Sequence, residues 1–288
     1  MSQKSRIIAA FAFAVISGTI GGQFPAIRYW AALCAVLAAC CAILLALADL
    51  SRRLWTVQGS FGEYSKITTI NLAAELHSME VVLRRCPECV IPTSSWSMRF
   101  ANLHAILDML DRVRPQTIVE LGSGISTVCV ASWLKSQGKG TILSFDHDNA
   151  WGELTMRCLR ESGLDAFAKI VIAPLKPDRS LGYDVEWYDV DPHIAEISDV
   201  DVVIVDGPPA YSFEKRISRL PALDKLHKRL SPAAVIVLDD ALRSGEGSVV
   251  DIWLKSFPEF ALHHVGSLTG LAILERSATP QPTRQALS

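Results

Sequence analysis

Five short apolar runs alternate with helical stretches between residues 117 and 255, and this alternation constrains the fold more than any other feature. The runs read TIVEL, TILSFD, AKIVIA, DVVIVD and AAVIVLD. Strands that are apolar throughout are buried on both faces, as in a parallel sheet covered by helices. Two closing runs, FALHHVG and LAILE, predict an antiparallel edge pair. The sequence therefore predicts a doubly wound, mostly parallel, seven-stranded α/β domain over residues 116–276.

Acidic residues stand at the carboxyl ends of four predicted strands: Glu120, Asp146, Asp206 and Asp239. In open α/β sheets, ligands bind in the crevice outside these strand ends. A single acid in such a place is commonly a helix cap. Four of them together predict a ligand site along one edge of the sheet.

The first predicted strand runs into a glycine turn, in the stretch IVELGSGIST at residues 118–127. A P-loop would need a lysine after its second glycine, and none follows here. A dinucleotide fingerprint needs a third glycine where this chain has Thr127, whose side chain would crowd the packing of helix on strand. The turn therefore disfavours an NAD-dependent oxidoreductase, which stays open as an alternative.

The same stretch, VELGSGIST, followed by ILSFDHD, resembles the first two motifs of class I S-adenosylmethionine-dependent methyltransferases. The chain is similar to a bacterial methyltransferase-like family over about residues 95–276. The resemblance implies a Rossmann-like methyltransferase fold, with the glycine turn against the methionine part of S-adenosylmethionine and an acid on its ribose. The cofactor-binding residues that it implies are Glu120, Gly122, Ser123, Gly124, Asp146 and Asp206.

Two later segments, DVVIVDGPPAY and VIVLDDALRSGEGSVV, resemble the segments of catechol-type O-methyltransferases that hold magnesium. This resemblance makes Asp206, Asp239 and Asp240 candidate ligands of Mg²⁺, and Asp206 and Asp239 candidate catalytic residues. Carboxylate oxygens suit Mg²⁺, which would lower the pKa of an acceptor hydroxyl group. Asp240 stands where that family has Asn. The alternative is that Asp239 and Asp240 cap the next helix or bind substrate directly.

Other functions remain open at this point. The stretch DGPPAY partly matches the D-P-P-Y motif of N-methyltransferases, but Gly207 separates the acid from the prolines. A catalytically silent membrane scaffold is a further alternative. Residues 173–199 predict a long aromatic loop, including Trp187 and Tyr188, that covers a ligand or packs on the sheet. Arg219 and Arg243 are expected to be solvated, with contact to an anionic substrate as the alternative. His263 and His264 are expected to be structural.

The N-terminal part, residues 1–52, predicts a membrane hairpin. Residues 7–24 and 30–48 carry no charge, and a helix of about 19 residues covers most of a hydrocarbon core. Lys and Arg flank the two spans at their outer ends, whereas the connector has only Arg28. This distribution predicts that both ends of the hairpin face the cytoplasm. Together with the resemblance to a bacterial family, it implies an inner-membrane protein whose catalytic domain faces the cytoplasm. Cleavage as a signal peptide, or as a lipoprotein at LAAC, is the alternative.

The remaining features set limits on function. Residues 53–115 predict a helical connector, and residues 277–288 a disordered tail. A net charge of −2 gives no attraction to nucleic acid. The lone pair Cys86 and Cys89 has too few neighbouring ligands for zinc, so it receives no role. The expected acceptor is a small or lipid-linked molecule that the sequence does not identify.

Overall fold

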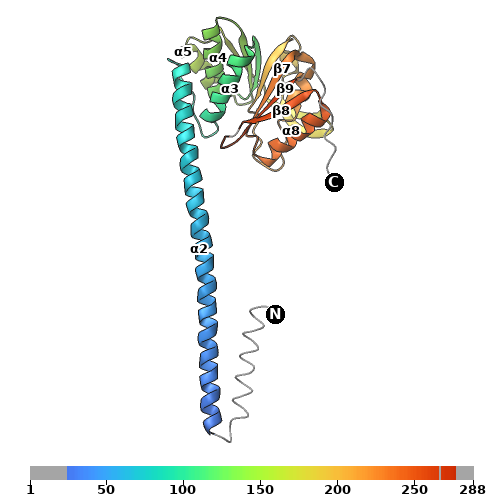
Figure 1. Cartoon of the computed structure of the whole chain (residues 1–288). Coiled ribbons are helices and arrows are strands. Elements are labelled where there is room, and N and C mark those ends of the chain that lie inside the picture. Colours follow the sequence, from blue (N-terminus) through green and yellow to red (C-terminus); the bar gives the residue numbers. More distant parts are fainter. Residues whose placement is uncertain (1–24, 266, 277–288) are drawn as a thin grey trace. The chain divides into compact units, whose positions relative to one another are not determined.

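The computed structural model describes residues 25–265 and 267–276 (Figure 1). The chain divides into two compact units, Met1–Ile70 and Asn71–Ser288. The predicted first span at residues 7–24 and the predicted tail at residues 277–288 lie outside the described residues. The seven-stranded sheet and the cavity at its edge lie in the second unit.

Helix α2 runs without a break from Pro25 to Arg85. Proline suits a first helical position because that position needs no N–H donor. Its segment Ala32–Leu54 has a mean hydropathy of 2.6, and this is the one helix among the described residues that is long and apolar enough to cross a membrane. The basic pair Arg52 and Arg53 ends the apolar stretch but not the helix, because neither residue interrupts helical hydrogen bonding.

A seven-stranded sheet confirms the predicted class of fold. Its strand order is β3-β2-β1-β6-β7-β9-β8, with the first five strands parallel and the last two antiparallel. The chain switches direction across the sheet between β1 and β6, which is where ligands bind in such folds. The strands are β1 (Thr117–Leu121), β2 (Thr141–Asp146), β3 (Ala168–Ile172), β6 (Val200–Val205), β7 (Leu230–Asp239), β8 (Phe260–Val265) and β9 (Leu271–Arg276).

Helices cover both faces of the sheet because the strand side chains alternate between two apolar cores. In β1, Ile118 belongs to one core and Val119 to the other. The first core contains residues of α3 (Phe100–Val113), α4 (Ile125–Gln137) and α5 (Asn149–Glu161). The second core contains residues of α7 (Pro221–Leu226) and α8 (Ser244–Ser256). This arrangement leaves the carboxyl ends of the strands free to form a site.

The predicted aromatic loop is instead mostly ordered structure. It contains an antiparallel hairpin of β4 (Leu175–Ser180) and β5 (Tyr183–Tyr188), followed by the short helix α6 (Asp191–Ile194). Leu181 and Gly182 make the hairpin turn with φ of 47° and 88°. The sequence hid this hairpin because Leu-Gly is not a usual turn signal and LKPDRS is polar and contains proline.

The helix expected after β6 is also shorter than the sequence suggests. Residues 212–220 form turns, and regular helix begins only at Pro221. A proline inside a helix removes a hydrogen bond, whereas it is favourable at the first turn. The irregular segment from Gly207 to Leu220 therefore lies next to the strand ends and contributes side chains to the site.

Candidate functional site

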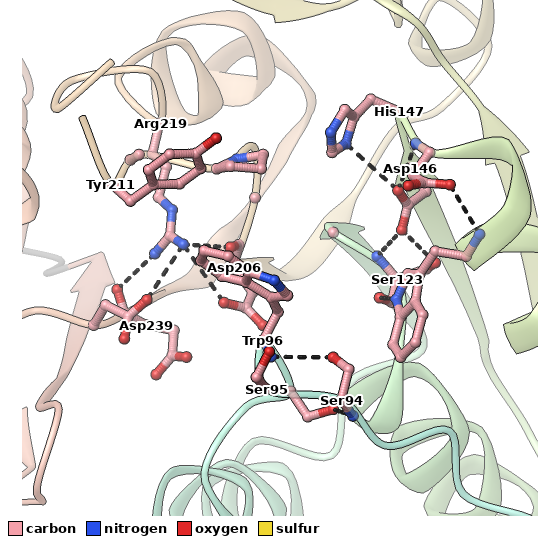
Figure 2. Close-up of a pocket in the computed structure, with 18 of the residues that line it drawn as sticks. Ser94, Ser95, Trp96, Ser123, Asp146, His147, Asp206, Tyr211, Arg219 and Asp239 are labelled. Carbon is pink, nitrogen blue, oxygen red and sulfur yellow. Dashed lines mark hydrogen bonds and ion pairs between the residues drawn. The ribbon is translucent and has the colours of Figure 1, made fainter. Parts of the chain in front are cut away.

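A cavity of about 520 Å³ opens at the carboxyl ends of β1, β2, β6 and β7 (Figure 2). In Figure 2, Asp146 with Ser123 and His147 lies on one side, and Arg219 with Asp206 and Asp239 lies on the other. The segment before α3 contributes Ser94 to Ser97 and Arg99 to the lining. The cavity therefore unites strand ends with a segment that the sequence pattern had not connected to a site.

The glycine turn after β1 is shaped by its contact with the segment after β6. Gly122 has φ of 99°, a conformation that side chains rarely tolerate. A Cβ atom on Gly122 would lie 2.9 Å from the backbone nitrogen of Gly207. The backbone nitrogens of Asp206 and Gly207 both donate to the carbonyl oxygen of Leu121, at 2.9 and 2.6 Å. Glycine is therefore required where the two strand ends meet.

Glu120, at the end of β1, is fully buried and is linked to the glycine turn through Thr127. The Thr127 hydroxyl group donates to its Oε2 at 2.5 Å, and the backbone N–H of Gly124 donates to the Thr127 oxygen at 2.9 Å. Burial raises the pKa of Glu120 to about 7, against the lowering effect of hydrogen bonds from Ser126 and Thr127. Thr127, which breaks the dinucleotide pattern, thus links the acid of β1 to the glycine turn.

Asp146 connects the turn to β2. Its Oδ2 accepts hydrogen bonds from the backbone N–H and the hydroxyl group of Ser123, at 2.9 and 2.5 Å. Its Oδ1 accepts from the backbone N–H of Asp148 at 3.0 Å and lies 3.5 Å from His147 Nδ1. Burial opposes ionisation, but the nearby His147 and the hydrogen bonds from Ser123 and Asp148 outweigh it and lower the pKa of Asp146. The cavity thus has an ionised carboxylate at this end.

Trp151 fixes the other side of the same turn. Its indole Nε1 donates to the carbonyl oxygen of Ser123 at 2.7 Å, and its ring lies 3.5 Å from where a Cβ atom on Gly124 would be. Sequence reasoning missed this residue, because a tryptophan in the first turn of α5 looks like an ordinary core position.

Three carboxyl groups meet on the opposite side of the cavity. Oxygen atoms of Asp206, Asp239 and Asp240 all lie within 4.8 Å of one another. Asp240 has φ of 60°, in the left-handed region that aspartate and asparagine tolerate better than most residues. The structure thus brings together the three acids that the sequence selected as candidate metal ligands, at the ends of β6 and β7.

The expectation that Arg219 is solvated is wrong, because its side chain is only 4% exposed. Its guanidinium group lies 3.6 Å from Asp206 Oδ1 and 3.4 Å from Asp240 Oδ2. It also donates to the backbone oxygens of Asp206 and Asp239, at 2.5 and 3.0 Å. Arg243 is partly exposed and contacts Asp240 Oδ2 at 3.0 Å. Arg219 therefore carries its charge inside the acidic cluster rather than in solvent.

The cluster contains more acids than cations. Glu246 at the start of α8 is buried and lies 3.6 Å from Arg219, so four acids face two arginines. Burial raises the pKa of Asp206 to about 6, although the charge of Arg219 lowers it. Burial, Asp206 and Asp240 together raise the pKa of Asp239 well above its usual value. The cluster therefore favours binding a proton or a cation.

Asn102 positions Asp239 from helix α3. Its amide Nδ2 donates to Asp239 Oδ1 in a short hydrogen bond, and also contacts Thr269 Oγ1 at 3.0 Å and the Gly270 carbonyl oxygen at 3.3 Å. Asn102 is fully buried. A buried polar residue in an otherwise apolar helix stripe was the available sequence signal, and it was missed.

Aromatic residues line the outer part of the cavity. Trp96 and Tyr211, which are 66% and 67% exposed, lie with their ring centroids 5.4 Å apart. Trp187 and Tyr188 are both buried in the same apolar core, and Tyr188 also lines the cavity. Of the predicted aromatic segment, Tyr188 is therefore the residue that connects the core to the cavity.

The cysteine pair lies apart from the cavity. The Cys86 thiol is buried 3.7 Å from the backbone oxygen of Cys129, and a hydrogen bond to Cys129 together with burial raises its pKa to about 12. His263 lies in the edge strand β8, also outside the cavity lining. These positions agree with the interpretation that neither contributes to the site.

Glu120→Gln is expected to stabilise the protein more at pH 8 than at pH 5. The folded pKa of Glu120 is about 7, raised from 4.5, so between these values the unfolded chain loses a proton that the folded chain keeps. Stability therefore falls as pH rises through this window, by at most about 3 kcal/mol, and levels off above it. Thermal unfolding at both pH values, with exposed Glu161→Gln as the control, measures this effect. An equal shift in Tm at the two pH values would contradict the assignment.

Comparison with known proteins agrees with this geometry. Residues 119–241 match a family model described as a methyltransferase domain, and no curated protein matches the chain. The O-methyltransferase TomG from Streptomyces achromogenes is 14% identical to this chain. The match covers 71% of this chain and 90% of the TomG chain, with a TM-score of 0.49. The methyltransferase PaMTH1 from Podospora anserina is 12% identical, with corresponding coverages of 71% and 88% and a TM-score of 0.49. The match of residues 119–241 to a methyltransferase domain, together with the glycine turn and the strand order, supports a class I S-adenosylmethionine-dependent methyltransferase.

Proposed function

We propose that this chain is a membrane-tethered O-methyltransferase that acts on a small or lipid-linked hydroxyl compound. The observation that carries the proposal is that one cavity is lined both by the glycine turn with Asp146 and by the acids of β6 and β7. Methyl transfer requires the cofactor and the nucleophile to be aligned at contact distance. A single cavity with a cofactor side and an acidic side meets this requirement.

The cofactor side is assigned to the glycine turn and β2. Backbone N–H groups at the start of α4 suit the methionine carboxylate, with Gly122, Ser123 and Gly124 forming the turn. The ionised Asp146 would accept hydrogen bonds from the ribose hydroxyl groups. Glu120 acts indirectly, because it is buried beneath the turn and holds it through Thr127. When bound, S-adenosylmethionine supplies a methyl group on a positively charged sulfur, which an acidic cavity favours.

The acceptor side is assigned to Asp206 and Asp239. Burial raises the pKa of both carboxyl groups above the usual range of aspartate, which makes them stronger bases. One of these carboxylates would accept the proton of the acceptor hydroxyl group and so make its oxygen nucleophilic. Bound S-adenosylmethionine would supply the methyl group, and cleavage of its carbon–sulfur bond would leave S-adenosylhomocysteine and a methyl ether as products. General bases are most effective when their pKa lies near the working pH. The acids thus favour O-methylation.

A divalent cation fits the same acids. Asp206, Asp239 and Asp240 would hold Mg²⁺, because three clustered carboxylates are hard oxygen donors with excess negative charge. Asn102 and Arg219 would orient these ligands from behind, as residues around metal sites commonly do. Such an ion would lower the pKa of the acceptor hydroxyl group.

The membrane part of the proposal rests on α2. Its segment Ala32–Leu54 has the length and hydropathy of a membrane span. Together with the uncharged residues 7–24 it would form a hairpin, with the catalytic domain on the cytoplasmic side of the inner membrane, where its cofactor is made. A tether of this kind suits an acceptor that is delivered by the membrane.

Asp146→Ala is expected to weaken S-adenosylmethionine and S-adenosylhomocysteine binding by roughly 1–3 kcal/mol, the loss expected when hydrogen bonds to a charged group are removed. Calorimetric titration of the full chain in detergent measures it, with NAD as a ligand that should not bind. Asp184→Ala, an exposed acid on β5, is the control. Unchanged affinity in Asp146→Ala would refute the ribose assignment, and wild type that binds neither sulfur cofactor would refute the whole proposal.

Asp239→Asn is expected to leave cofactor affinity within about twofold of wild type, because the substituted atom lies on the acceptor side of the cavity. It should abolish Mg²⁺-dependent heat in the same titration, since a charged ligand is lost from a site that needs three. Asp251→Asn on the exposed face of α8 is the matched control. Persistent Mg²⁺ binding in Asp239→Asn, or the absence of binding in wild type, would exclude this metal site.

The tether predicts that the full chain stays in the membrane pellet after alkaline extraction, with its C-terminal domain shielded from external protease in spheroplasts. Leu44→Arg combined with Leu45→Arg should release part of the protein, because each arginine costs about 2.5–3.5 kcal/mol at the centre of a span. Both leucines are exposed on α2. Recovery of the wild-type chain in the soluble fraction would contradict the tether.

A further inference from the structure

We propose that Tyr188 is a cofactor-positioning residue whose hydroxyl group donates a hydrogen bond to the methionine carboxylate of S-adenosylmethionine. The inference rests on the proposed function and adds to the site a residue from β5, outside the glycine turn and the acidic cluster. Its basis is a buried hydroxyl group, on a residue that lines the cavity, with no partner among the described residues.

The Tyr188 side chain is 1% exposed, and its oxygen makes no hydrogen bond within the described part of the chain. A buried hydroxyl group without a partner costs about 1–3 kcal/mol, and phenylalanine would fill the same space without that cost. Other buried polar atoms there also lack partners, for example in Trp187 and Ser144, but those residues do not line the cavity. His147 lines it, yet its side chain is one-third exposed. Tyr188 is therefore the fully buried group placed to meet a ligand.

The hydroxyl group lies where the two central strands end. A Cβ atom on Gly207 would lie 2.1 Å from the Tyr188 oxygen and 3.1 Å from the Cα atom of Gly122. The tyrosine oxygen, Gly207 and Gly122 are thus neighbours on the floor of the cavity. This floor is the part assigned to the methionine end of the cofactor, so the hydroxyl group faces that end.

The chemistry of the surroundings selects the carboxylate. Burial and the negative charge of Asp146 raise the pKa of Tyr188 well above its usual value, so its hydroxyl group stays protonated and can donate. A ligand carboxylate placed among acids needs donors of its own. The turn amides supply some of them, and Tyr188 supplies one from the opposite direction.

Tyr188→Phe tests the inference in the full chain, with Tyr183→Phe as the control because Tyr183 is an exposed tyrosine on the same strand. Calorimetric titration uses S-adenosylhomocysteine, which has the carboxylate, and 5′-methylthioadenosine, which lacks it. Tyr188→Phe should weaken S-adenosylhomocysteine binding about tenfold or more and leave 5′-methylthioadenosine binding unchanged. Tyr183→Phe should change neither.

Thermal unfolding is the second readout, and here the substitution is not expected to weaken the protein. Without cofactor, Tyr188→Phe should unfold at the same Tm as wild type or above it, because an unsatisfied hydroxyl group has been removed. With S-adenosylhomocysteine its gain in Tm should be smaller than that of wild type. Unchanged S-adenosylhomocysteine affinity, equal weakening of both ligands, or a lower Tm without cofactor would each overturn the inference. Wild type that binds no S-adenosylhomocysteine would instead refute the proposed function itself.

Discussion

The contact between Gly122 and Gly207 is the constraint on which the rest of the site depends. A Cβ atom on Gly122 would lie 2.9 Å from the backbone nitrogen of Gly207, and a Cβ atom on Gly207 would lie 2.1 Å from the Tyr188 oxygen. Because β1 and β6 are adjacent at the point where the sheet changes direction, this contact sets the floor of the cavity. The glycine turn and the acidic cluster lie within one cavity because the two strand ends are held this tightly.

Buried charge is the second organising element. Arg219 binds the backbone oxygens at the ends of β6 and β7 and lies beside the carboxylates of Asp206 and Asp240. A buried charge is stable only when it is paired and hydrogen-bonded. Arg219 therefore holds the ends of β6 and β7 together. Its positive charge also stabilises several acids at one edge of the sheet.

The sequence predicted the sheet well because fully apolar strands and a glycine turn are local signals. It also selected Asp146, Asp206 and Asp239 correctly as residues that share one cavity, since parallel strand ends meet at one edge. It missed Asn102, whose partner Asp239 lies 137 residues away in the sequence. It also missed the burial of Arg219, whose partner Asp239 lies 20 residues away. It also missed the hairpin of β4 and β5, whose strands are too polar to resemble strands.

The left-handed backbone of Asp240 restricts which residues this position can accept during evolution. At φ of 60°, asparagine and glycine are the natural replacements, because most other side chains would strain the chain. A single base change between aspartate and asparagine codons would remove one negative charge from the cluster without altering its backbone. Related proteins can therefore differ in the charge of the acidic cluster while the shape of the cavity stays the same. Such a difference in charge can change which acceptor is preferred without changing the fold.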